Sequence, residues 1–217
     1  MTGVWHNRPL QQDRGFAGDD SGAVLVEFAI VISLFFFLFF TLLDFGRLSG
    51  NNVMAQTAAQ VAARIAVVRP PACAGVPELH ARGTVAPGTT PPRYGTSCKA
   101  GASVCAAAAE VTCVGAAANP TANEIWNRIR VFLPTDATIA ALEFTYTYDS
   151  NLGFLGGPYT PVVTVELNLP NFQFISPLGQ LAAAAGASSP GTLGNPISYS
   201  NFSISLPAED LASGENG

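Results

Sequence analysis

The sequence feature that most limits what this chain can fold into is an unbroken apolar run near its N-terminus. Residues 23–43 read AVLVEFAIVISLFFFLFFTLL, and five phenylalanines between positions 35 and 40 leave no polar face. As an α-helix, these 21 residues would be about 32 Å long, close to the roughly 30 Å hydrocarbon core of a bilayer. A 217-residue chain could hardly surround so uniform a helix with its own core. We therefore expect a membrane-spanning helix.

A cleaved secretory signal peptide is the main alternative to a retained anchor. The apolar region of such a peptide is about 7–15 residues long and is followed by small residues at the cleavage site. The run in this chain is longer and leads into Asp44-Phe45-Gly46-Arg47, which is a poor cleavage site. A retained anchor is therefore the better interpretation. Arginines lie on both sides of the run, so the positive-inside rule does not decide its orientation.

Composition excludes two broad classes of protein. Apolar residues make up 48% of the chain, whereas an intrinsically disordered protein has low hydrophobicity and high charge. Ten basic and 15 acidic residues give a net charge of −5, and Lys99 is the only lysine. A nucleic-acid binder needs clustered Lys and Arg to meet phosphates, so nucleic acid is not an expected partner.

The one charged residue inside the apolar run has a distinctive setting. The sequence Gly22-Ala23-Val24-Leu25-Val26-Glu27 resembles the type IV prepilin processing signature, in which the chain is cut after the glycine and glutamate is the fifth mature residue. The resemblance implies that a prepilin peptidase removes residues 1–22 on the cytoplasmic face. The new ammonium group of Ala23 would lie about 6 Å along the helix axis from Glu27. Pairing of the two would offset their desolvation, within one subunit or between neighbours.

Two further blocks extend this resemblance to a family. After the opening Gly22–Ala29 segment, which ends in Glu27-Phe28-Ala29, come Asp44-Phe45-Gly46-Arg47 and the alanine-rich residues 56–64. Together they resemble the TadE-like family, the minor pseudopilins of the tight-adherence (Flp) pilus system. The resemblance implies a structural protein without catalytic residues or cofactors. Its implied partners are the membrane, the prepilin peptidase and other pilins, with Glu27 and Phe28 as assembly contacts.

Residues 45–69 continue the helix with an amphipathic pattern. A polar row recurs at every fourth position and an apolar stripe lies beside it, and the prolines at 70 and 71 stop the helix. Asp44 and Arg47, three positions apart, are predicted to form a membrane-interface pair. The polar row is Asn52, Gln56, Gln60 and Arg64, and the apolar stripe is Met54, Ala58, Val61, Ile65 and Val68.

All four cysteines lie in the Pro-, Gly- and Ala-rich residues 70–120. They are Cys73, Cys98, Cys105 and Cys113, an even number that in an exported domain favours two disulfides with three possible connectivities. A zinc site with His80 is a weaker alternative, because no C-x-x-C pair is present. Free buried thiols are the remaining possibility.

The remainder of the chain predicts one short helix and three strands. Thr121-Ala122-Asn123-Glu124 resembles a capping box and precedes a short helical pattern that ends at Pro134. Residues 142–148, 163–169 and 202–206 alternate apolar and polar side chains, as half-buried antiparallel strands do. Residues 180–195 are interpreted as a loop or linker. The expected fold class is α+β, with a long pilin-like helix followed by a small antiparallel sheet.

No motif of a catalytic or metal site is recognisable in the sequence. His80 has no nucleophile motif around it, and neither a P-loop nor an H-E-x-x-H sequence is present. Asp149-x-Asn151-x-Gly153 lacks the later ligands of an EF-hand and is interpreted as a turn. We therefore expect neither enzymatic activity nor a small-molecule substrate.

The sequence as a whole predicts a single-pass protein of the bacterial cytoplasmic membrane, with its C-terminal domain exported. Its expected parts are a leader (1–22), a transmembrane helix (23–44), an amphipathic helix (45–69) and a cysteine-containing α+β domain (70–217). The resemblance to the TadE-like family implies a function in assembly of a Tad-type pilus used in adherence. Two alternatives stay open: a signal-anchored envelope protein with a ligand-binding β domain, and a minor pseudopilin of a secretion system.

Overall fold

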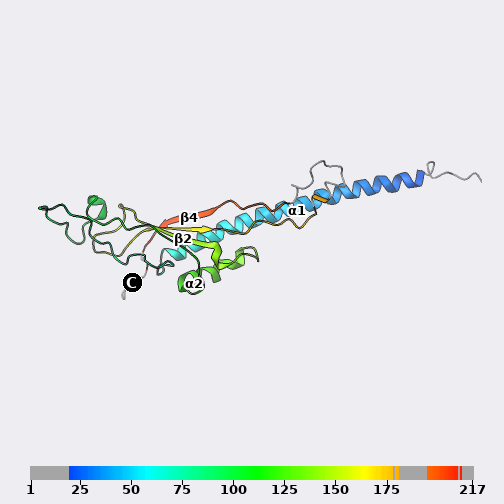
Figure 1. Cartoon of the computed structure of the whole chain (residues 1–217). Helices are drawn as coiled ribbons and strands as arrows, with labels where there is room; N and C mark the ends of the chain where they lie inside the picture. The colour runs from blue at the N-terminus through cyan, green and yellow to red at the C-terminus, as the bar shows by residue number, and fades with distance from the viewer. Residues whose placement is uncertain (1–19, 178, 181–194, 210, 212–217) are drawn as a thin grey trace, which may run out of the picture.

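The structure is a computed structural model that describes residues 20–177, 179–180, 195–209 and 211. Its dominant element is α1 (Asp20–Ala66), a single helix of 47 residues. The N-terminal half of α1 projects alone, and the rest of the chain is packed around its C-terminal half (Figure 1). The predicted leader, apart from its last three residues, lies outside the described residues.

A four-stranded antiparallel sheet covers the C-terminal half of α1. Its order follows the chain: β1 (Val111–Val114), β2 (Leu142–Thr147), β3 (Val162–Leu167) and β4 (Phe202–Pro207). The side chains of β2 and β3 alternate strictly between buried and half-buried. The predicted α+β fold is therefore confirmed. β1 was not expected from the sequence, and it pairs with β2 from Val111 opposite Tyr146 to Val114 opposite Glu143.

The core between helix and sheet is built from alanine on the helix side. Six alanines of α1 are completely buried, and they face apolar side chains of the sheet such as Phe144 and Val165. Small side chains let the strands approach the helix backbone closely. The predicted apolar stripe was therefore partly wrong, because Met54 is 49% and Val68 41% exposed. The buried alanines are Ala55, Ala58, Ala59, Ala62, Ala63 and Ala66.

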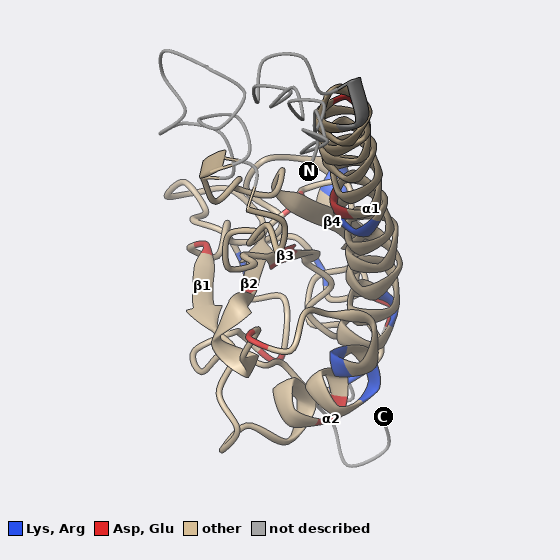
Figure 2. Ribbon diagram, turned by 90° about the vertical axis from the view of Figure 1, so that its right-hand side faces the viewer, with Lys and Arg blue, Asp and Glu red and all other residues tan. Residues whose placement is uncertain are grey.

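A second helix, α2 (Pro120–Ile129), packs beside the end of α1 (Figure 2). Its N-cap is Asn119, whose side chain accepts a hydrogen bond of 2.9 Å from the Ala122 backbone N–H. The predicted capping box at Thr121 was therefore displaced by two residues. Thr121 instead donates its hydroxyl to the Pro70 carbonyl at 2.8 Å, which ties α2 to the chain that leaves α1.

The chain beyond α1 turns sharply. α1 ends at Ala66 rather than at residue 69, and Pro70 disfavours the helical conformation at Arg69. Three short 3-10 helices complete the domain: η2 (Cys98–Ala100), η3 (Arg130–Phe132) and η4 (Ile139–Ala141).

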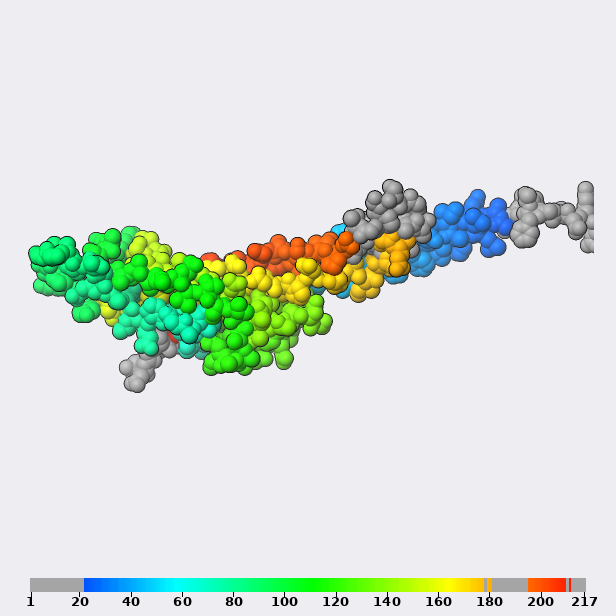
Figure 3. Space-filling view, viewed as in Figure 1, coloured from blue at the N-terminus to red at the C-terminus, as the bar shows by residue number. Residues whose placement is uncertain are grey.

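Beyond the sheet, the segment that follows β3 and the segment that precedes β4 extend side by side along α1 (Figures 1 and 3). We call these two segments the arm. The arm comprises residues 168–177 and 195–201, and Phe172 and Ile197 exchange backbone hydrogen bonds of 2.8 and 3.1 Å across it. The predicted linker at 180–195 lies outside the described residues, except for residues 180 and 195 at its two ends.

The opposite end of the domain is a lobe of loops, residues 77–106 and 148–160, which we call the distal lobe. Isolated bridges join its two parts, including Leu79 with Pro158 and Ser97 with Phe154. It lies at the end of the molecule away from the projecting half of α1 (Figure 1).

Candidate functional site

The residues predicted to carry processing and assembly all lie in the first turns of α1. Gly22, Ala23, Glu27 and Phe28 have exposed side chains or backbones, and Phe28 is 62% exposed. This helix holds the only segment among the described residues that is long and apolar enough to cross a membrane, and no residue of its most apolar stretch is buried. An apolar surface of that size needs lipid or other helices around it.

The Glu27 side chain has no ion pair or hydrogen bond among the residues that the structure describes. It lies one helical turn after Ala23, and the helix is continuous between them. A cut after Gly22 would therefore leave the remaining helix unchanged and place the new ammonium group near the Glu27 carboxylate. The Gly22–Ala23 bond lies within the first turn of α1, so this turn must unwind before a peptidase can cut there.

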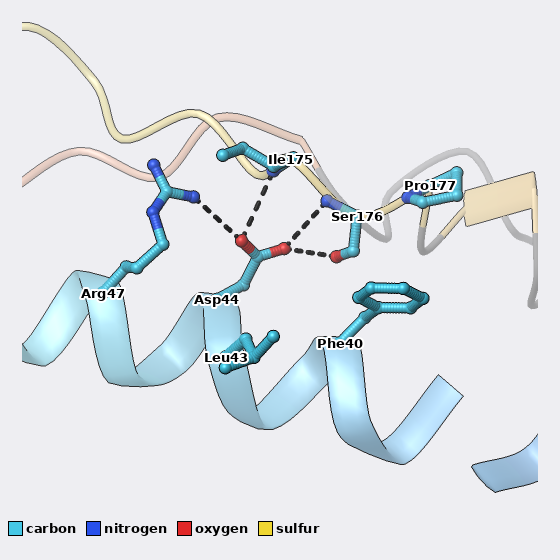
Figure 4. A pocket seen from close by; sticks show the side chains of 7 residues that line it. All are labelled: Phe40, Leu43, Asp44, Arg47, Ile175, Ser176 and Pro177. Carbon is cyan, nitrogen blue, oxygen red and sulfur yellow. Dashed lines mark hydrogen bonds and ion pairs between the residues drawn. The ribbon is translucent and has the colours of Figure 1, made fainter. Parts of the chain in front are cut away.

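Asp44 marks the end of the apolar run, and it is only 3% exposed (Figure 4). The expected contact with Arg47 is present, with 3.0 Å between the guanidinium nitrogen and Oδ1. The other partners come from the arm: the Ser176 N–H donates to Oδ2 at 3.0 Å and the Ile175 N–H to Oδ1 at 3.4 Å. The Ser176 hydroxyl donates to Oδ2 as well.

These donors explain how a carboxylate is tolerated beside apolar side chains. Removing an ionised carboxylate from water is costly unless hydrogen bonds and an opposite charge replace the water. Asp44 receives both, while Phe40 and Leu43 line the same small pocket. The Arg47 guanidinium also lies 5.3 Å from the centre of the Phe172 ring of the arm. Asp44 and Arg47 therefore fasten the arm to α1.

The sequence predicted the Asp44–Arg47 pair but not its partners in the arm. Asp44 and Ser176 are separated by 132 positions in the chain. Ser176 lies in no recognisable motif, and its neighbour Ile175 contributes only a backbone N–H. A local pattern therefore contains no signal for this contact.

The four cysteines form two disulfides in the structure. Cys73 pairs with Cys113, which links the segment after α1 to β1, and Cys98 pairs with Cys105 within the distal lobe. His80 lies near the second pair, with its ligand atom and both sulfurs within 4.8 Å of one another. Thiolates, rather than disulfide sulfurs, are the strong zinc ligands, so this cluster in its disulfide form does not suit a zinc ion.

His80 is a core residue of the distal lobe. It is 2% exposed, and its Nε2 accepts a hydrogen bond of 3.2 Å from the Thr160 backbone N–H. Burial lowers the pKa of His80, which favours the neutral ring. Gly153 has a positive φ of 78° and packs directly against this ring, where a β-carbon would clash with Nε2.

On the outer face of α1, close approach by another helix is possible just beyond the apolar run. Gly46 and Gly50 are one turn apart, and a β-carbon at either would meet no atom within 4 Å. Val53, 59% exposed, and Met54 continue the outer surface. Small residues let helix backbones approach closely, which is typical of helix–helix contacts in membranes.

Comparison with known proteins identifies one family. Residues 22–64 match the model of the family described as TadE-like protein. The match begins at the predicted processing glycine and includes the apolar run, the Asp44–Arg47 pair and most of the buried alanines. The resemblance predicted from the sequence is therefore confirmed over these residues, and it suggests a protein associated with a Tad pilus. No curated protein and no solved structure matches the chain.

Proposed function

We propose that this protein is a minor pseudopilin that takes part in assembling a Tad (Flp) type IV pilus used in surface adherence. One observation carries the proposal: the TadE-like match covers a single continuous helix whose first half is exposed and apolar and whose second half is packed on its own domain. Such a division suits a subunit that presents a helix to other subunits and carries a small domain outside the membrane.

The proposed assembly begins with processing. A prepilin peptidase cuts between Gly22 and Ala23 on the cytoplasmic face and releases residues 1–22. The cut leaves α1 anchored in the cytoplasmic membrane as a single span, with residues 70–217 exported. The disulfides of that domain fit an oxidising compartment outside the cytoplasm.

The second step is helix packing. The ammonium group of Ala23 pairs with Glu27 of the same or a neighbouring subunit, and Phe28 packs beside that pair. In a low-dielectric surrounding, each charge would be too costly to leave alone. The pairing therefore favours one register between neighbouring helices. Further along the same helix, on a different face, Gly46 and Gly50 leave room for another backbone to approach.

The test replaces Glu27 in the native host. Glu27→Gln keeps the size of the side chain and removes its charge, and Ile30→Leu, on the same exposed helix, is the control. Loss of one partner from a buried ion pair costs about 3–5 kcal/mol, so we expect Glu27→Gln to reduce surface pili to background. Ile30→Leu should leave piliation unchanged. The measurement is the amount of pilin in the sheared surface fraction.

Mass spectrometry of the same cells should show that the Glu27→Gln protein is still processed and disulfide-bonded. Wild-type piliation with that variant would contradict the proposal and favour an anchored envelope protein with a ligand-binding domain. Normal piliation together with loss of protein secretion would instead favour a pseudopilin of a secretion system.

A further inference from the structure

The arm follows α1 down to the last turn of the apolar run. Its contacts follow α1 toward the N-terminus. The Tyr199 hydroxyl accepts a hydrogen bond of 3.1 Å from the Asn51 side chain, and the Arg47 guanidinium packs on the Phe172 ring. The Phe174 ring lies 6.1 Å from the Phe45 ring. The arm then reaches Asp44 with Ile175 and Ser176, as Figure 4 shows.

The end of the arm overlaps the apolar run itself. Pro177 and Ser176 line the pocket that Phe40 and Leu43 form on α1, and both of those residues belong to residues 23–43. Figure 3 shows the arm in yellow and orange along the helix, reaching the start of its blue projecting part. A bilayer that surrounds residues 23–43 would therefore meet the end of the arm as well.

The composition of the arm suits a membrane interface. Residues 168–177 and 195–201 include no charged residue, whereas the adjoining sheet carries Glu143 and Glu166 on its outer face. Three aromatic rings lie along the arm, and the tyrosine among them is of a residue type enriched at membrane interfaces. They are Phe172, Phe174 and Tyr199.

The outer surface of the arm's end is apolar. Ile175 is 75% exposed although its backbone is held against Asp44, so its side chain points away from the domain core. On the face of α1 that the arm contacts, Leu43 is 49% and Phe40 39% exposed, and both line one pocket with Ile175. Helix and arm thus form one continuous apolar surface at the boundary of the run.

We propose that the arm is a second membrane contact of this protein. Residues 174–177 enter the outer interface of the bilayer that α1 crosses, and Asp44 holds them at that depth through Ser176. The occupant of this surface is lipid, because the surface is continuous with the predicted span and because the arm carries no charge whose burial in the bilayer would be costly. A second contact beside the helix fixes the tilt of the exported domain relative to the membrane.

The inference rests on insertion of α1 into a membrane, and not on the pilus function proposed above. It is tested with the full chain reconstituted in phosphatidylcholine vesicles. In a background of Trp5→Phe and Trp126→Phe, a single tryptophan is introduced as Ile175→Trp. Tyr94→Trp in the distal lobe, where Tyr94 is also 75% exposed, is the matched control, and Val31→Trp reports insertion of α1.

Brominated lipid and aqueous acrylamide then quench the tryptophan emission from opposite sides. We expect Ile175→Trp to emit at shorter wavelength than Tyr94→Trp and to be quenched several-fold more strongly by brominated lipid. Val31→Trp should be protected from acrylamide. The exposed position of Ile175 makes a folding defect unexpected, and intact disulfides in each variant check this.

The inference is overturned if Ile175→Trp is quenched by acrylamide as strongly as Tyr94→Trp while Val31→Trp is quenched by brominated lipid. It is also overturned by a blue-shifted Ile175→Trp emission that brominated lipid does not quench and that is lost when the protein is diluted among vesicles. That result would assign the surface to a second copy of the chain.

Discussion

The side chains of Asp44 and His80 are both almost completely buried, and their surroundings set their charge differently. Asp44 faces donors only, including the Arg47 guanidinium, so its carboxylate is held as an ion. The Nε2 of His80 accepts from a backbone N–H, which requires that nitrogen to be unprotonated. The first residue fastens the arm to the helix, and the second lies at the centre of the distal lobe.

The neutral state of His80 makes the stability of the domain depend on pH. Burial lowers the folded-state pKa of His80 below its ordinary value of 6.5. As the pH falls from 7.5 through 6.5, the unfolded chain binds the proton first, so the free energy of unfolding decreases. The slope is at most about 1.4 kcal/mol per pH unit. Urea unfolding at pH 7.5, 6.5 and 5.5 in detergent micelles measures it.

A His80→Gln variant serves as the control, because it removes the titrating group from the same position. Its stability should be lower at pH 7.5 but should depend much less on pH between 7.5 and 5.5. An equal pH dependence in both proteins would show that His80 does not carry the effect.

At the scale of elements, the alanine surface of α1 determines how closely the sheet approaches. Leucine at a buried alanine would need space that the strands occupy. We expect Ala62→Leu, at a position with no exposed surface, to lower the free energy of unfolding by about 1–3 kcal/mol. Gln60→Leu places the same leucine side chain on the exposed side of the same helix and should change stability little. Urea unfolding compares the two, and equal stabilities would contradict the packing.

How much of these elements the sequence predicted depends on the range of the interactions that form them. Alternation of apolar and polar residues predicted β2, β3 and β4 to within one or two residues, because burial of one face is a local pattern. β1 was not predicted, because its four residues are too few to show a recognisable alternating pattern. The sheet packs on the alanine face of α1 and not on the predicted stripe that includes Met54. The strands that bury this face lie about 100 positions later in the chain, so no local pattern indicated it.

For the candidate site too, residues in local motifs were predictable from the sequence, and residues whose role depends on distant contacts were not. Gly22, Glu27 and the Asp44–Arg47 pair are recognisable because their motifs are continuous in sequence. Ser176 and the arm were not predictable, because their role comes from contact with a helix more than 100 residues earlier. The even number of cysteines indicated two disulfides, but three connectivities were equally compatible with it.

For the whole molecule, the two disulfides enclose loops of very different length. Cys73 and Cys113 are 40 positions apart, and Cys98 and Cys105 are 7 apart. Restriction of the unfolded chain gives about 4 kcal/mol for the longer loop and about 2 kcal/mol for the shorter one. Replacing each pair by alanine should therefore destabilise the domain more for Cys73 and Cys113, as urea unfolding would measure. A larger loss from the Cys98 and Cys105 pair would contradict this order.

The proposed function requires that the long helix is released from its leader and then used for assembly. Its most direct test is the mature N-terminus of the protein, determined by mass spectrometry in host cells with and without the prepilin peptidase. We expect a chain that begins at Ala23 when the peptidase is active and one that keeps residues 1–22 when it is deleted. A chain that keeps those residues in the presence of the active peptidase would contradict it.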